Sequence, residues 1–222
     1  MYPILFEFGF ITIFAQWLFV AIGFVVGSHV FIKLSKLYRI RLSLLSQYSL
    51  SLFFWTLGMS RLVAVVLHPQ YYFYRMDFSD FLSIFAIWDK VFSFWGAICA
   101  WFIGLLYISL KNKESTEVRA KFRDIMMPSI LVGMVFGNIG AFLEGINYGT
   151  PTNLPWGMVF KSPNVKYITE IHPTQLYSAL YITLIAFCLV IILKKLHGRL
   201  PGFATELTIF MFSFFRFFEE FL

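Results

Sequence analysis

The chain has 222 residues, of which 59% are hydrophobic and only 14% are charged, and its formal net charge is +6. Soluble domains are about 45–50% apolar and about 25% charged, so this composition excludes an ordinary water-soluble globule. With 14 Gly, 8 Pro and 2 Cys, the collagen-like, disordered and disulfide-rich classes are excluded as well. What remains is an integral membrane protein.

Long uncharged stretches predict the membrane-spanning helices, because a span needs roughly 20 apolar residues. We expect an all-α, polytopic membrane helix bundle of about six spans that forms a single domain over residues 1–222. The predicted spans are about 8–32, 43–67, 91–110, 125–143, 173–193 and 203–222, and the last of these is interrupted by charged residues. The first stretch is expected to remain as a span, because its apolar run exceeds the 7–15-residue core of a cleaved signal peptide.

The distribution of Lys and Arg predicts the orientation of the spans. These residues concentrate in segments 33–41, 111–123 and 194–199, and they are fewer in the alternate segments. Basic loops stay in the cytoplasm, so the amino terminus is expected outside. The basic residues lie at helix ends rather than in one patch, which argues against a nucleic-acid partner. Cys99 and Cys188 fall inside spans, where we expect them to act as packing residues.

The two external loops, 68–90 and 144–172, differ in character. The first is aromatic and amphipathic, which is typical of a segment that lies in the membrane interface. The second is rich in Gly, Pro and Asn, which predicts a small irregular periplasmic region. Both would lie where a lipid headgroup or an exported chain can be met.

Ionisable side chains at membrane depth are candidates for a functional site, because charge is costly in lipid. Polar amides near them would support the same site. The candidates are Arg61, Glu144, His172, Arg216, Glu219 and Glu220, with Gln16, Asn138, Asn147 and Gln175 as polar support.

Each charged candidate also has a purely structural interpretation. Arg61 can extend from a helix end to the interface, and Glu144 can close its span as an interfacial charge. His172 precedes a predicted helix start and can serve there in capping or packing. Arg216 and Glu220 are spaced i, i+4 and can simply pair along one helix face. The sequence leaves these alternatives open.

Glycines recur between Gly133 and Gly149, with polar residues among them. Small residues allow helices to approach closely, so helix packing explains the spacing. Asn138 and Glu144, however, add hydrogen-bonding groups that lipid does not satisfy. A polar site and a packing seam therefore both remain possible.

Several longer motifs occur in a characteristic order. They are HPTQLY at 172–177, PTNLPWGMVF at 151–160 and GNIGAFLEGINYG at 137–149, with weaker similarity in WDKVFSFWGA at 88–97, Ser60-Arg61 and FFRFFEEF at 214–221. In these motifs the chain resembles the bacterial prolipoprotein diacylglyceryl transferase family. The resemblance covers nearly the whole chain.

The resemblance implies a multi-pass enzyme of the bacterial plasma (inner) membrane that acts in lipoprotein biosynthesis. Such an enzyme moves the diacylglyceryl group of phosphatidylglycerol onto the lipobox cysteine thiol of a preprolipoprotein, and glycerol phosphate leaves. A cation must neutralise the departing phosphate, and a base must favour the thiolate. The expected partners are phosphatidylglycerol, the preprolipoprotein signal peptide with its lipobox Cys, and membrane lipid. No metal or organic cofactor is required.

Taken together with the polar candidates above, the resemblance implies two groups of site residues, in which Glu144, Asn138 and Gln16 are not the residue types that the family has at those positions. Arg216 would hold the phosphate, His172 or Glu144 would assist the thiol, and Glu220 would complete the catalytic group. The substrate- and lipid-binding residues would be Arg61, Gln16, Asn138, Gly140, Gly149, Gln175 and Tyr177.

The sequence departs from the family's signature at several of these positions. Asn138 stands where the family has Arg, and Asn is neutral. Ala141 and Glu144 replace two Asn residues, and Ile146 replaces a Glu.

Two further departures lie elsewhere. The family's HGG element reads Trp95-Gly96-Ala97 and so lacks its His, and Gln16 occupies a position where the family has Tyr. The family would also continue into one more helix after Leu222. Two functions therefore remain: an active transferase with a remodelled site, or a non-catalytic or redirected member that binds phospholipid or lipoprotein precursor without transfer.

Overall fold

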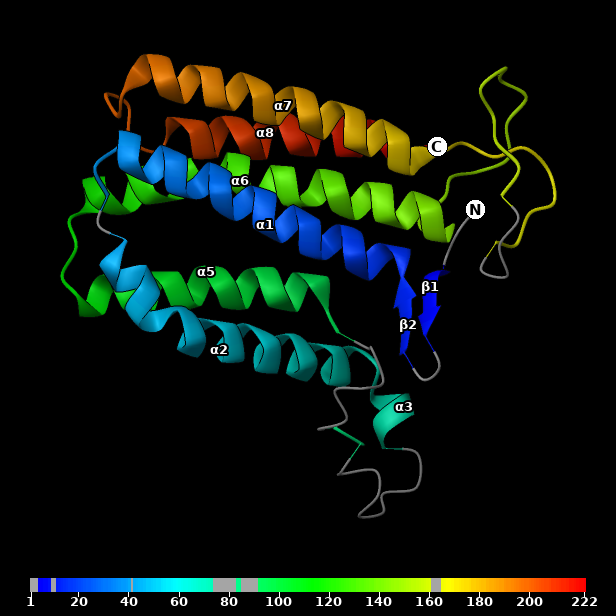
Figure 1. The fold of residues 1–222 in the computed structure, drawn as a ribbon, viewed down its shortest axis with the longest axis horizontal. Helices are drawn as coiled ribbons and strands as arrows, with labels where there is room; N and C mark the ends of the chain where they lie inside the picture. Colours follow the sequence, from blue (N-terminus) through cyan, green and yellow to red (C-terminus); the bar gives the residue numbers. More distant parts are fainter. Residues whose placement is uncertain (1–3, 9–10, 41, 74–82, 85–91, 161–164) are drawn as a thin grey trace. The chain divides into compact units, whose positions relative to one another are not determined.

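The computed structural model describes residues 4–8, 11–40, 42–73, 83–84, 92–160 and 165–222, and this part of the chain is largely helical (Figure 1). It divides into two compact units. The first unit comprises Met1–Ile40 and Glu117–Leu222, and the second unit comprises Arg41–Thr116.

The elements of the first unit are two short strands and four helices. They are β1 (Ile4–Phe8), β2 (Ile11–Phe14), α1 (Ala15–Leu37), α6 (Thr116–Glu144), α7 (Thr174–Leu196) and α8 (Phe203–Glu219). The second unit contains α2 (Ser43–Leu67), α3 (Pro69–Tyr72) and α5 (Phe94–Lys111).

Four helices among the described residues are long and apolar enough to cross a membrane: α1, α2, α6 and α7. Helix α5 is apolar but shorter, and α8 carries charged residues. The predicted class, a polytopic helical membrane protein, is thereby confirmed. Much of the expected interfacial segment 68–90 lies outside the described residues. The described part of this segment consists of α3 and residues 68, 73 and 83–84.

The amino-terminal end differs from the prediction. Strands β1 and β2 pair antiparallel, with an irregularity between Ile4 and Phe6. Helix α1 therefore begins at Ala15 rather than near residue 8. The physical reason is the composition of residues 4–14, where Ile, Phe and Thr favour extended backbone and Gly9 separates the two runs. A short apolar run does not distinguish a strand from the start of a span.

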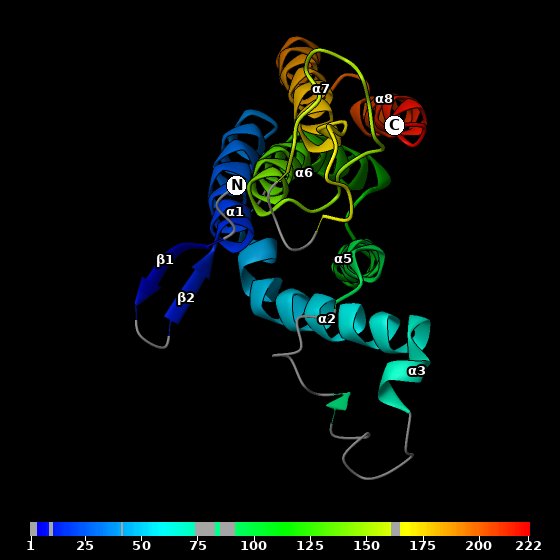
Figure 2. The same ribbon diagram turned by 90° about the vertical axis from the view of Figure 1, so that its right-hand side faces the viewer.

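Helix α1 packs directly on α6 at glycines. A Cβ atom at Gly27 would stand 2.7 Å from the carbonyl oxygen of Ser129, and one at Gly23 would stand 2.9 Å from that of Gly133. A Cβ at Gly140 would likewise meet the Cα of Gln16 at 2.9 Å. Figure 2 shows α6 between α1 on one side and α7 and α8 on the other. Close helix packing thus accounts for part of the glycine run, as small-residue helix pairs do in membranes.

One end of the first unit, which we call the basic end, collects the carboxyl ends of α1 and α7 and the amino ends of α6 and α8. The hydroxyl of Tyr38 donates to the carbonyl oxygen of Leu193 at 3.1 Å. Burial raises the pKa of Tyr38, and the negative charge of Asp124 raises it further. The basic residues at this end include Lys36, Arg39, Lys121, Arg123, Lys194, Lys195 and Arg199.

Asp124 anchors α8 at the basic end. Its side chain is 2% exposed and accepts hydrogen bonds from the backbone N–H groups of Gly202 and Thr205, at 2.7 and 2.8 Å. It also accepts one from the Thr205 hydroxyl at 2.7 Å. The N–H groups of Gly202 and Thr205 are among the backbone donors that the start of a helix leaves unsatisfied, so Asp124 of α6 caps α8.

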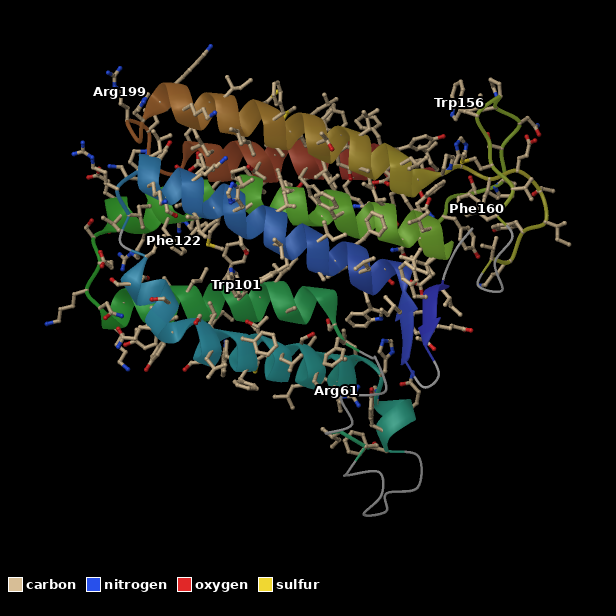
Figure 3. All side chains as sticks on the ribbon, viewed as in Figure 1. Arg61, Trp101, Phe122, Trp156, Phe160 and Arg199 are labelled. Carbon is tan, nitrogen blue, oxygen red and sulfur yellow. The ribbon has the colours of Figure 1, made fainter. Side chains whose placement is uncertain are left out.

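The opposite end of the first unit, which we call the head end, carries the loop 145–173, the start of α7 and the end of α8. Figure 3 shows Trp156 and Phe160 in this loop, with Arg199 at the far end of α7. The two ends of the unit therefore differ in both charge and structure.

Candidate functional site

The described residues of the head-end loop, 145–160 and 165–173, are mostly irregular, as predicted, but they have a packed interior. Phe160 is 4% exposed, and its ring lies 5.7 Å from that of Phe142 and 6.4 Å from that of Tyr148. Ile171 is fully buried, and it exchanges two backbone hydrogen bonds of 3.0 Å with Met158. These contacts fold the loop over the end of α6 and fix the residues on both sides of it.

Gly149 joins three parts of the head end. Its N–H donates to the carbonyl oxygen of His172 at 3.0 Å, and the N–H of His172 donates to Thr150 at the same distance. The N–H of Thr150 donates to the carbonyl oxygen of Leu222, beyond the end of α8. A Cβ atom at Gly149 would lie 2.8 Å from both His172 and the Leu222 oxygen. Only glycine fits at this junction.

His172 lies just before α7 and is 9% exposed. Its Nδ1 atom is 3.2 Å from the hydroxyl oxygen of Tyr177, one turn into the helix. The same oxygen accepts a hydrogen bond of 2.8 Å from the indole N–H of Trp156, which comes from the loop. Two predicted site residues, His172 and Tyr177, are thus in direct contact, and Trp156 joins them.

Gln175 is 1% exposed on the first turn of α7. Its Nε2 donates to the carbonyl oxygen of Ile146 at 2.6 Å, which ties α7 to the chain that follows α6. Its Oε1 is buried and has no hydrogen-bond partner among the described residues. An unsatisfied buried acceptor is costly, and a ligand that carries a donor would relieve it.

The polar residues of α6 are arranged differently. Asn138 donates to the carbonyl oxygen of Met134 in its own helix at 2.9 Å, so its side chain binds backbone rather than another candidate. Gly140 serves the close approach of α1 at Gln16. Glu144 is the last residue of α6 and is partly buried.

Arg216 lies on the last turn of α8 between two carboxylates. Its side chain is 52% exposed, with Nη1 3.1 Å from Glu219 and Nη2 2.8 Å from Glu220. The two carboxylates differ strongly in burial, since the side chain of Glu219 is 5% exposed and that of Glu220 is 70% exposed.

Glu219 also accepts hydrogen bonds from the hydroxyls of Ser178 and, at 2.9 Å, Tyr181 on α7. Its carboxylate therefore links Arg216 to the neighbouring helix. The sequence placed both Glu219 and Glu220 among the candidates, but it predicted only Glu220 as the partner of Arg216. The i, i+3 spacing from Arg216 was the available signal, but only the fold shows that the partners on α7 bury this carboxylate.

Arg61 belongs to the second unit and is 6% exposed. Its Nε donates to the carbonyl oxygen of Ile84 at 2.9 Å and its Nη2 to that of Ser83 at 2.7 Å. The guanidinium also lies over the ring of Tyr72, 4.9 Å from its centroid. Arg61 therefore holds residues 83–84 of the loop 68–90. A lipid-binding role for Arg61 stays a prediction.

The structure thus brings together Gly149, His172, Gln175 and Tyr177 at the head end, and it joins Arg216 to the same end of α7 through Glu219. Gln16, Asn138 and Gly140 lie along the α1–α6 pair. Within the described residues there is no group of three His, Cys, Asp or Glu side chains that could hold a metal ion.

Fold and site together define a polytopic helical membrane protein whose polar groups converge where a packed loop meets two helix ends. The chain belongs to the prolipoprotein diacylglyceryl transferase family, whose sequence model matches residues 3–222. This finding confirms the resemblance that the motifs carry.

Individual relatives share the same name. The chain is 30% identical over 229 residues to the phosphatidylglycerol–prolipoprotein diacylglyceryl transferase of Prochlorococcus marinus (strain MIT 9215), with 96% of this chain and 76% of the relative covered. It is 34% identical over 132 residues to that of Clostridium tetani, covering 59% of this chain and 51% of the relative. The enzyme of Polynucleobacter asymbioticus is 38% identical over 99 residues, which cover 45% and 36%.

Proposed function

We propose that this chain transfers the diacylglyceryl group of phosphatidylglycerol to the lipobox cysteine thiol of preprolipoproteins. Membership of the family supports the reaction class. The observation that carries the proposal to this chain is the head end, where the half-exposed Arg216 near the end of α8 and the buried His172 and Gln175 at the start of α7 lie beside a folded loop.

The reaction places clear demands on the site. The thiol sulfur forms a bond to the glyceryl carbon, the bond between that carbon and the phosphate oxygen breaks, and glycerol phosphate leaves with the electron pair. The thiol proton must go to a base, because the thiolate is the nucleophile. A fixed cation must stabilise the negative charge that grows on the leaving phosphate.

Arg216 is the proposed cation. Glu219 fixes one side of its guanidinium, while the exposed Glu220 is the partner that an incoming phosphate can exchange with. Glu144 and His172 are the two candidate bases. Gln16, Asn138 and Gln175 would orient the headgroup, and Arg61 is a further candidate for lipid binding.

The proposed location is the bacterial plasma membrane, which the chain would cross several times. The basic end of the first unit would face the cytoplasm, because basic residues are retained there. The head end and the amino terminus would then lie outside, where exported preprolipoproteins and outer-leaflet phospholipid meet.

A second function remains a candidate because of the residues on and after α6. Asn138 donates to its own helix rather than outward, and Ile146 has no titratable group. A site with fewer charges could bind phospholipid or a lipoprotein precursor without any transfer. In this alternative the head end binds the same ligands as a transferase would, but no diacylglyceryl group is transferred.

A transfer assay separates the two functions. The full chain in membranes that contain phosphatidylglycerol is incubated with a lipobox peptide that has a single cysteine, and the diacylglyceryl adduct is measured by mass spectrometry. We expect an adduct that requires the thiol, so a Cys→Ser peptide and membranes without the protein should give none. Folded protein that binds phosphatidylglycerol but forms no adduct would refute transfer and support the second function.

A further inference from the structure

We propose that Trp156 is a positioning residue that acts through Tyr177 to hold His172 in its Nε2–H tautomer. His172 then donates a hydrogen bond to a phosphate oxygen of the bound phospholipid and does not receive the thiol proton. The identity of this ligand rests on the proposed function, whereas the tautomer rests on the three side chains alone.

The first step concerns the direction of the hydrogen bond between the loop and α7. An indole nitrogen is a donor only, so Trp156 must donate to the Tyr177 oxygen at 2.8 Å. In that bond the Tyr177 hydroxyl acts as the acceptor, so its own proton is still available to be donated to another group.

The second step places this proton. The only other polar contact of the Tyr177 hydroxyl within the described residues is the Nδ1 atom of His172, at 3.2 Å. If Nδ1 carried a hydrogen, the hydroxyl would accept two bonds and its own proton would have no protein partner. If Nδ1 is bare, all three groups are satisfied, and satisfied hydrogen bonds are the rule for a side chain as buried as that of His172. Tyr177 therefore donates to Nδ1.

The third step concerns the other ring nitrogen. A neutral imidazole with a bare Nδ1 carries its hydrogen on Nε2, so that atom is a donor. Nε2 has no hydrogen-bond partner in the part of the chain that the structure describes. A phosphate oxygen is the strongest acceptor that the substrate offers to such a donor, and it gains charge as glycerol phosphate leaves.

The same arrangement makes His172 a poor base. Its only bare nitrogen, Nδ1, already accepts from Tyr177, so a proton from the thiol could bind there only if the Tyr177 hydroxyl turned away. Of the two candidate bases, only Glu144 then remains available to accept the thiol proton.

The tautomer can be measured directly by nuclear magnetic resonance, because protonated and bare imidazole nitrogens have well-separated ¹⁵N shifts. The chain contains only 4 His, so the full-length protein labelled with ¹⁵N-histidine gives few signals. A His172→Gln variant identifies the signals of interest. His197 serves as an internal reference, since its Nδ1 lies 3.2 Å from the carbonyl oxygen of Lys195 and must carry a hydrogen to bond with it.

In phosphate-free maltoside micelles, at a pH where the ring is neutral, we expect His172 as the Nε2–H tautomer and His197 as the Nδ1–H tautomer. Tyr177→Phe removes the donor and should convert His172 to a mixture, and Trp156→Phe should do so to a smaller extent. Trp17→Phe is the matched control, because Trp17 is equally exposed, at 55%, and belongs to the same unit. It should leave the tautomer unchanged.

The ligand is tested by adding phosphatidylglycerol to the same micelles. The Nε2–H proton of His172 should move downfield, and diacylglycerol, which has the ester oxygens but no phosphate, should not move it. An Nδ1–H tautomer in the unaltered chain, or an unchanged tautomer in Tyr177→Phe, would overturn the positioning role. A downfield shift with diacylglycerol would overturn the phosphate contact. None of these measurements requires transfer. If only the proposed function fails, the protein shows the expected tautomer but forms no adduct in the transfer assay.

Discussion

Asp124 and Glu219 are both buried carboxylates of the first unit, and they lie at opposite ends of α8. Asp124 accepts from neutral donors only, at the amino end of the helix, where the helix dipole favours a negative charge. Glu219 accepts from two hydroxyls and also holds Arg216, whose side chain is half exposed. Burial of a carboxylate therefore does not define its role. One charge is enclosed and fastens a helix, while the other fastens a cation that a ligand can reach.

Removal of the Asp124 carboxylate tests whether an enclosed charge fastens α8. Asp124→Ala leaves the first turn of α8 without its acceptor, so we expect the free energy of unfolding to fall by about 3 kcal/mol, since bonds to charged groups and helix caps each contribute on this scale. Unfolding in mild detergent measures this loss. Glu117→Ala on the same helix is the control, because its exposed ion pair with Lys121 should contribute below about 1 kcal/mol. Equal losses would remove the special role of Asp124.

The second prediction tests the open side. Arg216→Ala removes the proposed phosphate cation and should lower kcat/KM for transfer about 100-fold, as the loss of one electrostatic stabiliser commonly does. Lys166→Ala, an exposed cation of the head-end loop, should change it little. The transfer assay measures both variants, and equal effects would exclude Arg216 from the site.

A third pair of variants compares the neighbours of Arg216. Glu219→Gln keeps an acceptor for Ser178 and Tyr181 but loses the charge that fixes the guanidinium, so we expect transfer to fall about tenfold. Glu220→Gln removes an exposed pair worth at most about 1 kcal/mol and should cost less than about fivefold. Should Glu220→Gln prove the more damaging, the exposed carboxylate would be the one that matters to the site.

Two glycine variants test the packing of α1 against α6, the helix that joins the two ends of the unit. Gly27→Ala should destabilise the protein by about 1 kcal/mol or more, because the added Cβ meets a backbone oxygen of α6 that cannot easily move. Gly137→Ala has open space around its Cβ and should stabilise α6 by about 0.5–1 kcal/mol, since Ala is the better helix former. Thermal unfolding of the two variants measures whether each substitution raises or lowers the stability of the protein. A stabilising Gly27→Ala would contradict the close approach of α1 and α6.

The sequence predicted the long helices well because charge and hydropathy alone define them. The span expected near 125–143 lies within α6, and the one near 173–193 nearly coincides with α7. The pairing of β1 with β2 was not predicted, since a short apolar run has no period long enough to separate strand from helix. Asp124 was read as the boundary of a span, and nothing local indicates that its partners are Gly202 and Thr205.

The proximity of the candidate residues was predictable where one motif holds several of them. His172, Gln175 and Tyr177 share a single helix start, so the motif alone placed them together. The contact between Trp156 and Tyr177 joins residues 21 positions apart across an irregular loop, where no periodicity constrains distance. The link from Glu219 to α7 likewise depends on how two helices pack, which composition does not encode.

The cap that Asp124 provides has a consequence for biosynthesis. Its partner Gly202 follows 78 residues later in the chain, so α6 is made and inserted well before the amide that will bind this carboxylate exists. Because a charge in lipid is costly, we expect this carboxylate to stay hydrated at the headgroup level until α8 arrives, which would keep the amino end of α6 at the membrane surface. Helix α8 therefore docks onto an acceptor that α6 already provides, and its arrival removes the charge of Asp124 from water and completes the basic end.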